Sequence, residues 1–144
     1  MINQIYRLVA PKQIRTEFVD FILGEENIVV RPTYLSICAA DQRYYTGSRG
    51  RVVMKQKLPM ALIHEGVGEV IYDPKAEIPV GTKVAMVPNT PMEQDEVIKD
   101  NYLRSSKFRA SGFDGFMQSL VVMRRDLIVP FTVKAKVAVL AELM

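Results

Sequence analysis

The side chains of this sequence that are best suited to metal chemistry are few, and they fall in two short segments. Cys38 is the only cysteine and His64 the only histidine among 144 residues. Asp41 follows the cysteine closely, and Glu65 directly follows the histidine. Thiolate, imidazole and carboxylate are the ligands that Zn²⁺ prefers, and three protein ligands with an open fourth position are typical of a catalytic zinc. The residue types therefore indicate one catalytic zinc site.

A purely structural interpretation competes with the metal site. A single cysteine is often a small buried hydrophobic residue, and a single histidine is often a core residue with a hydrogen-bonded ring. The context favours the metal, because Cys38 ends the apolar run 28–37. Adjacent strand residues point to opposite faces, so His64 and Glu65 reach one metal together only if the backbone bends. We expect Gly66 to supply that bend.

The elements that must position these residues are mainly short strands. Apolar segments alternate with Gly, Pro, Asn and Asp, which is typical of an antiparallel fold. The expected strands cover residues 28–30, 34–37, 68–72, 83–87 and 117–123, and the expected short helices cover residues 39–45 and 92–107. The second helix is predicted from its apolar residues and from acidic residues followed by basic ones. The pattern predicts a mainly β fold, an antiparallel β-barrel with short helices.

Length, composition and charge narrow the class of protein. A chain of 144 residues with 49% apolar content is one domain with a sizeable core. The net charge of +3 has no basic stripe interleaved with aromatic residues, which argues against a nucleic-acid partner. The sequence shows neither a secretory signal nor an apolar run long enough to cross a bilayer, so no membrane partner is expected. A single free thiol suits the reducing cytoplasm.

Four ordered motifs resemble those of the medium-chain zinc-dependent alcohol and polyol dehydrogenases. They are SICAAD at 36–41, IHEGVGEV at 63–70, VGTKV at 80–84 and GFDGFMQ at 112–118. The resemblance implies a GroES-like β-barrel catalytic domain over residues 1–144. That family also has a Rossmann cofactor domain, but no Gly-x-Gly-x-x-Gly follows a strand in this sequence. We therefore expect a catalytic-domain fragment, truncated before the cofactor domain and inactive on its own.

Less common residues at 31–47 and 86–91 give a narrower resemblance, to the bacterial ribulose-5-phosphate reductases. It implies that the full-length enzyme uses NADP(H) to reduce ribulose 5-phosphate to ribitol 5-phosphate. It also implies a homo-oligomer and a cytidylyltransferase that converts the product to CDP-ribitol for teichoic acid or related surface polymers. Two alternatives stay open: a zinc dehydrogenase for another polyol or sugar phosphate, and a non-catalytic GroES-like binding module.

The resemblance also implies roles for individual residues. Cys38, His64 and Glu65 match zinc ligands, and Glu142 lies near the position of a fourth ligand. Asp41 matches a carboxylate that accepts the second N–H of the imidazole and fixes its tautomer. The alternative for Asp41, from the residues alone, is that it caps the start of a helix.

The sequence departs from the family pattern at two places. Ala40 stands where most relatives carry the Ser or Thr that begins a proton relay, so a bound water, Glu65 or Tyr45 must take over. The segment 89–112 contains no cysteine, whereas many relatives hold a structural zinc there with four. We therefore expect one zinc per chain.

A sugar-phosphate substrate requires cations near the metal, because guanidinium and ammonium groups bind phosphate. The expected substrate-binding residues are Arg43, Arg109, Lys107 and, for the sugar hydroxyls, Tyr45. Arg49 and Arg51 are further candidates. The alternative for each cation is an ordinary surface charge.

Overall fold

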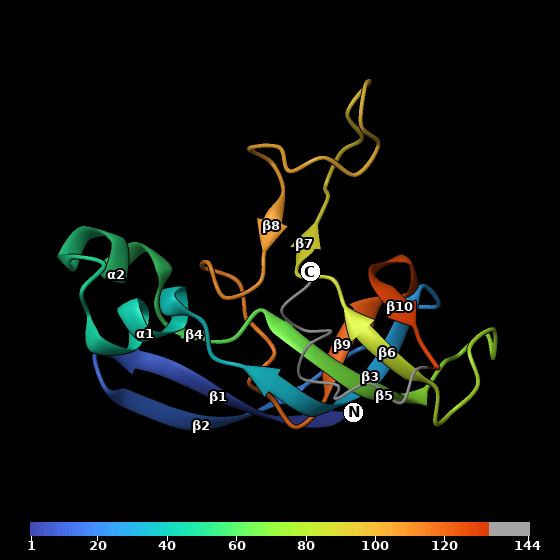
Figure 1. Ribbon diagram of the computed structural model, residues 1–144. Helices are drawn as coiled ribbons and strands as arrows, with labels where there is room; N and C mark the ends of the chain where they lie inside the picture. Colours follow the sequence, from blue (N-terminus) through green and yellow to red (C-terminus); the bar gives the residue numbers. More distant parts are fainter. Residues whose placement is uncertain (133–144) are drawn as a thin grey trace.

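The computed structural model describes residues 1–132, and its described part consists mostly of antiparallel strands (Figure 1). The strands are β1 (Ile2–Ala10), β2 (Gln13–Asp20), β3 (Asn27–Ser36), β4 (Met60–Ala61), β5 (Glu65–Tyr72), β6 (Lys83–Met86), β7 (Asn89–Thr90), β8 (Lys107–Phe108), β9 (Val121–Arg124) and β10 (Ile128–Pro130). The helices are α1 (Ala39–Thr46), α2 (Arg51–Lys57) and the 3₁₀ turn η1 (Arg125–Leu127). The predicted mainly β fold is confirmed.

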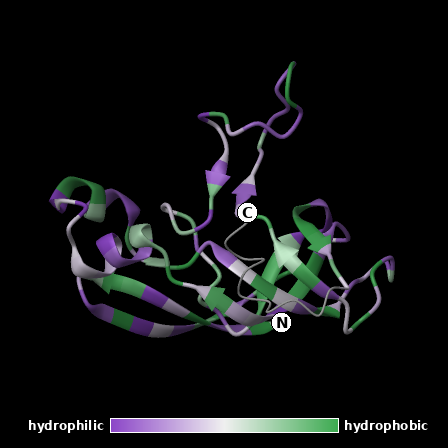
Figure 2. Cartoon of the chain, viewed as in Figure 1, coloured by the Kyte–Doolittle hydropathy of each residue, from purple (hydrophilic) through white to green (hydrophobic). Residues whose placement is uncertain are grey.

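The central sheet has five strands in the order β10-β6-β5-β3-β9. β3 joins the two strands that were expected at 28–30 and 34–37 into one, with irregular register against β5 on either side of Pro32. A proline has no N–H to donate, so it breaks the ladder without ending the strand. Most Val and Ile residues of this sheet are buried in the core, and Figure 2 shows apolar residues concentrated along β3, β5, β6 and β9.

A long hairpin of β1 and β2 forms the base of a second sheet, in the order β2-β1-β4. The sequence analysis did not predict this hairpin. β2 mixes polar and apolar residues, as Figure 2 shows, and most of its residues are exposed. A bridge between Ile5 and Gln118 and the pairing of β1 with β4 join this sheet to the rest of the fold.

The arm between β7 and β8 projects from the body of the domain (Figure 1). A helix was expected over residues 92–107, and that expectation is wrong, because the segment forms bends and turns. The carboxylate of Asp95 accepts the backbone N–H groups of Val97 and Ile98, which closes a local turn in place of a helical one. Val97 is 90% exposed, so no core holds this segment as an amphipathic helix.

The helix α1 begins directly after Cys38 and ends at a left-handed Gly47. Its buried residues are Asp41 and Tyr44, and α2 contributes Met54 to the core. The chain therefore passes from the end of β3 into α1 within a few residues, which fixes where Cys38 points. Among the described residues, no helix combines the length and apolar character needed to cross a membrane.

Candidate metal centre

The three expected metal ligands converge at the junction of β3, α1 and β5. Cys38 lies between β3 and α1, and His64 and Glu65 lie where β5 begins. The distance from Cys38 Sγ to His64 Nε2 is 3.8 Å, and His64 Nε2 lies 3.7 Å from Glu65 Oε1. One ligand atom from each residue lies within 4.8 Å of the other two. Residues 26 positions apart thus form a single cluster.

This cluster fits a zinc ion by both chemistry and spacing. Zinc bonds of about 2.3 Å to sulfur and 2.0–2.1 Å to nitrogen in a tetrahedron place ligand atoms about 3.5 Å apart. The distances of 3.8 Å and 3.7 Å are close to this ligand-to-ligand distance. A small side-chain movement would bring the third pair of ligand atoms, from Cys38 and Glu65, to the same separation. The set of one sulfur, one nitrogen and one oxygen suits zinc, and residues 1–132 supply three of the four ligands of a tetrahedral site.

The bend that brings His64 and Glu65 together occurs at Ile63, whereas Gly66 was expected to supply it. Ile63 has φ 70°, a left-handed conformation that is rare for a β-branched residue. Gly66 is an ordinary strand residue of β5, paired with Leu35, and a Cβ there would lie 2.6 Å from Leu35 Cδ2. Its role is therefore close packing. Strained backbone of this kind persists where surrounding contacts hold it, often at functional sites.

Asp41 fastens the two ligand-bearing segments to each other. Its Oδ2 accepts the N–H of Cys38 at 3.0 Å, and its Oδ1 accepts the N–H of Ile63 at 2.8 Å. The side chain is buried, and within residues 1–132 no hydrogen bond joins it to the His64 ring. The hydrogen bonds that Asp41 makes within residues 1–132 thus go to backbone N–H groups, and its role as a partner of the imidazole stays a prediction. Asp41 holds the start of α1, as the capping alternative expected, and Ile63 as well.

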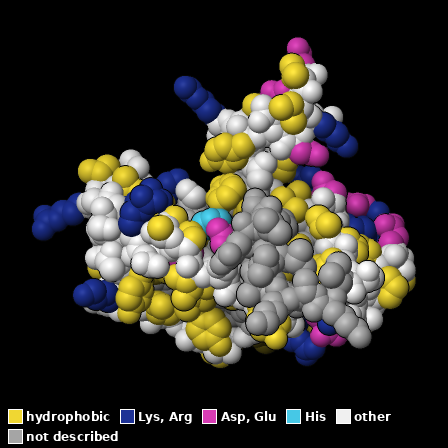
Figure 3. All heavy atoms as spheres, viewed as in Figure 1, with side chains coloured by type: hydrophobic (Ala, Val, Ile, Leu, Met, Phe, Trp, Pro, Cys, Tyr) yellow, Lys and Arg dark blue, Asp and Glu magenta, His cyan; other side chains and the backbone are white. Residues whose placement is uncertain are grey.

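The surroundings of the cluster are half-buried and partly aromatic. The side chains of His64 and Glu65 are 18% and 25% exposed, and the imidazole is visible at the surface in Figure 3. Phe108 packs edge-on against His64 with ring centroids 5.3 Å apart. Desolvation by burial raises the pKa of the Cys38 thiol; a backbone hydrogen bond from Asp41 lowers it, and the Asp41 carboxylate raises it further. A bound cation would supply the positive charge that favours the thiolate.

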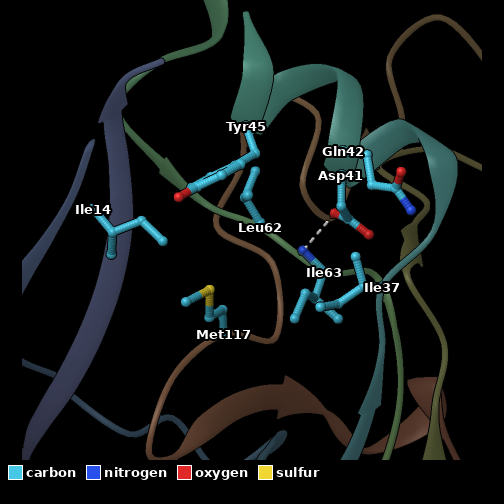
Figure 4. Close-up of a pocket in the computed structure, with 8 residues that line it drawn as sticks. All are labelled: Ile14, Ile37, Asp41, Gln42, Tyr45, Leu62, Ile63 and Met117. Carbon is cyan, nitrogen blue, oxygen red and sulfur yellow. Dashed lines mark hydrogen bonds between the residues drawn. The ribbon is translucent and has the colours of Figure 1, made fainter. Parts of the chain in front are cut away.

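An apolar pocket of 210 Å³ lies beside the cluster, beneath α1 (Figure 4). Ile37 and Ile63, which precede the ligands Cys38 and His64, form part of its wall. Tyr45 lies across the pocket from these ligand-bearing segments and directs its ring toward Ile14 of β2 (Figure 4). This hollow has little polar surface, so it suits an apolar group better than a phosphate.

The structure separates the expected phosphate-binding cations. Arg43 is exposed on α1 and lines no described pocket, while Lys107 lies on β8, next to Phe108. Arg109 is buried and donates hydrogen bonds to the carbonyl oxygens of Asp114 and Val122, at 3.0 Å each. Desolvation lowers the pKa of Arg109 to about 10. Arg109 is therefore a structural cation rather than a phosphate ligand. Glu142, the expected fourth metal ligand, lies outside the described residues.

Two residues around the cluster were not predicted to shape it. Phe108 lies on the arm, packs against the His64 imidazole and so limits its position. Gly115 lies against the segment that precedes His64, and a Cβ there would be 2.3 Å from the carbonyl oxygens of Leu62 and Ile63. Gly115 belongs to one of the four motifs, but its spacing gave no sign of this close approach.

Comparison with known protein families agrees with the motifs. The model of the alcohol dehydrogenase GroES-like domain matches residues 24–133. The chain belongs to this family. The match covers the three clustered ligands and the arm, and it extends from the start of β3 past the end of β10.

Among curated relatives of this GroES-like domain, the Bacillus spizizenii ribulose-5-phosphate reductase is 57% identical over 146 residues, covering 100% of this chain and 43% of that protein. A ribulose-5-phosphate reductase of Streptococcus pneumoniae is 45% identical, covering 99% of this chain and 42% of that protein. The crystal structure of Staphylococcus aureus TarJ in complex with NADPH matches with TM-score 0.75 and 44% identity, covering 98% of this chain and 37% of that one. The chain thus spans less than half the length of these relatives.

Proposed function

We propose that this chain is the metal-binding catalytic domain of a zinc-dependent, NADPH-linked ribulose-5-phosphate reductase. The observation that carries the proposal is the convergence of Cys38, His64 and Glu65 within 4.8 Å. The names of the relatives support the substrate, and the NADPH in the TarJ crystal structure supports the cofactor. In this proposal residues 1–144 are the GroES-like domain, and a Rossmann domain elsewhere in the full-length protein binds NADPH.

The chemistry requires a polarised carbonyl and a source of one proton. A zinc ion held by Cys38, His64 and Glu65 would act as a Lewis acid on the C2 carbonyl of ribulose 5-phosphate. Within the chain, Asp41 keeps the thiol and imidazole segments at a fixed separation. Ala40 offers no hydroxyl for a proton relay, and Tyr45 lines the apolar pocket. The proton that reaches the product oxygen therefore comes through Glu65 or from solvent.

The product of this reaction, ribitol 5-phosphate, needs a further enzyme to be used. In the proposal a cytidylyltransferase converts it to CDP-ribitol for teichoic acid or related polymers, and the reductase works in the cytoplasm as a homo-oligomer. The resemblance of residues 31–47 and 86–91 to the reductase subfamily supports this placement.

The test uses the full-length protein with Cys38→Ala and His64→Ala, and with Glu96→Gln as an exposed control. We expect one zinc per chain in the unchanged protein and in the control, and loss of both zinc and NADPH-dependent reduction in the two ligand variants. Circular dichroism should show that both variants keep their strand content. Turnover at the normal rate in either ligand variant would overturn the zinc mechanism, and a panel of other ketose phosphates checks the substrate.

A further inference from the structure

A cationic hollow lies one aromatic ring away from the candidate metal centre. It has a volume of 310 Å³ and lies between the end of α2, the arm at β8 and the turn at 111–113. Its charged lining residues are Lys57, Arg104 and Lys107, and no acidic residue is part of the described lining. A hollow of this size accommodates a small polar group together with its water.

The connection between the hollow and the metal centre is Phe108. This residue lines the hollow and also packs against His64, with ring centroids 5.3 Å apart. Tyr102 extends the same wall, edge-on to Phe108 at 5.8 Å. The hollow and the candidate metal centre are therefore neighbours that share Phe108.

The cations of the hollow are not neutralised by neighbouring carboxylates. Within residues 1–132, neither Arg104 nor Lys107 takes part in an ion pair, whereas Arg31, Arg124 and Arg125 are all paired with acidic side chains. Unpaired cations converging on one concave surface create a positive potential that attracts anions.

Neighbouring groups fix the position of these cations and add to their field. Lys57 donates to the carbonyl oxygen of Ser111 at 3.1 Å, which leaves its ammonium with further N–H groups to donate. Phe113 lines the hollow, and Lys107 lies over its ring at 5.9 Å. The buried guanidinium of Arg109 lies over the same ring at 4.4 Å, so a fourth positive charge lies behind the wall.

We propose that this hollow binds the phosphate of the sugar-phosphate substrate, with Lys57, Arg104 and Lys107 as its cationic ligands. The inference rests on the proposed function, because it assumes that the reacting carbon binds at the metal. Phosphate needs convergent charged donors, and this hollow supplies them on the far side of Phe108 from the candidate metal centre. The apolar pocket beneath α1 offers no cation to a phosphate.

A phosphate could reach this hollow from two sources, the sugar or NADPH. The sugar phosphate is favoured because Phe108 forms a wall of the hollow and also touches a metal ligand. A ligand bound at the metal and a phosphate in the hollow would thus both lie against Phe108. Kinetic constants for both substrates distinguish the two sources.

The experiment compares Lys107→Gln, Lys57→Gln and the control Lys55→Gln in the full-length protein. Lys55 lies on the same helix as Lys57 and is exposed outside the hollow. We expect the KM for ribulose 5-phosphate to rise about 10- to 100-fold in each of the first two variants, as for loss of a charged hydrogen bond. The KM for NADPH, the zinc content and kcat/KM for unphosphorylated ribulose should stay within twofold. Lys107→Arg should restore most of the affinity.

Each other outcome has a definite meaning. An unchanged KM for ribulose 5-phosphate in both variants, with normal turnover in the parent, would overturn the phosphate site and leave the proposed function intact. A rise confined to the KM for NADPH would overturn the assignment to the sugar. A parallel loss of kcat/KM for ribulose and for ribulose 5-phosphate would show structural damage and would also overturn the phosphate site. Absence of turnover in the unchanged, zinc-loaded protein would overturn the proposed function itself, and this inference with it.

Discussion

Removing the carboxylate of Asp41 should loosen both ligand-bearing segments at once. Its two oxygens hold the N–H groups of Cys38 and Ile63 at 3.0 Å and 2.8 Å, and the side chain is 2% exposed. A hydrogen bond to a charged group contributes about 1.5–3 kcal/mol, so Asp41→Ala should lower the free energy of unfolding by about 3–6 kcal/mol. Because a whole domain is stable by only about 5–15 kcal/mol, this variant is close to unfolding.

Asp41→Asn makes the same test with the shape of the side chain preserved. An amide has one acceptor oxygen, so the variant keeps one of the two hydrogen bonds and turns an NH₂ group toward the other N–H. We expect it to lose about 1.5–3 kcal/mol of stability. Its zinc affinity should fall about 10- to 100-fold, as is typical when a group that orients a metal ligand is removed.

The assay separates stability from metal binding. Urea unfolding with a chelator present gives the stability of the metal-free chain, and competition with a chromophoric chelator at neutral pH gives the zinc affinity. Asp100→Asn, on the exposed arm, is the matched control and should change neither quantity. If Asp41→Asn kept both the stability and the zinc affinity of the parent, the argument that this carboxylate joins the two segments would be refuted.

Two further predictions concern packing and charge. Gly115→Ala should destabilise the chain by about 1–3 kcal/mol or more and weaken zinc binding, because its Cβ would lie 2.3 Å from the carbonyl oxygens of Leu62 and Ile63. The control is Gly24→Ala, whose Cβ meets only one side-chain atom, at 3.4 Å. Equal melting temperatures for the two variants would contradict this prediction. The guanidinium paired with Asp73 holds the pKa of that carboxyl well below its usual range. The folded state therefore keeps the Asp73 carboxyl ionised at a pH where the unfolded state binds a proton. The contribution of this carboxylate to the free energy of unfolding is complete above the unfolded pKa, about 3.9, and is lost as the pH falls below it. Asp73→Asn should be less stable than the parent at pH 7, with a gap that narrows below about pH 4; a gap that stays constant from pH 7 to pH 3 in urea titrations would show that the pair has no such role.

The candidate metal cluster was predictable because its side-chain chemistry is rare in this chain. A single cysteine and a single histidine, each followed by a carboxylate, leave few ways to build a zinc site. The structure brings Cys38, His64 and Glu65 together as expected. The strands that carry them were also predictable, because branched apolar residues with Gly and Pro between them mark strands regardless of tertiary contacts.

Errors arose where local pattern and tertiary packing disagree. The segment 92–107 has the apolar spacing and charge order of a helix, but it projects as an arm and has no core to bury Val97 against. Arg109 has the residue type of a phosphate ligand, yet the surrounding fold buries it among backbone carbonyl groups. The few residues adjacent in sequence to a position do not determine whether its side chain is buried or exposed.

The bend at Ile63 shows why the geometry of the centre exceeds what a sequence pattern predicts. A glycine two or three residues away is the natural candidate for a bend, since it adopts unusual conformations without strain. Here the strain falls on a β-branched residue with φ 70°. Its N–H is held by Asp41 at 2.8 Å and its carbonyl oxygen accepts the N–H of Phe116 at 2.6 Å. The partner segments come from 22 and about 50 residues away, so the position of His64 depends on residues that take no part in the chemistry.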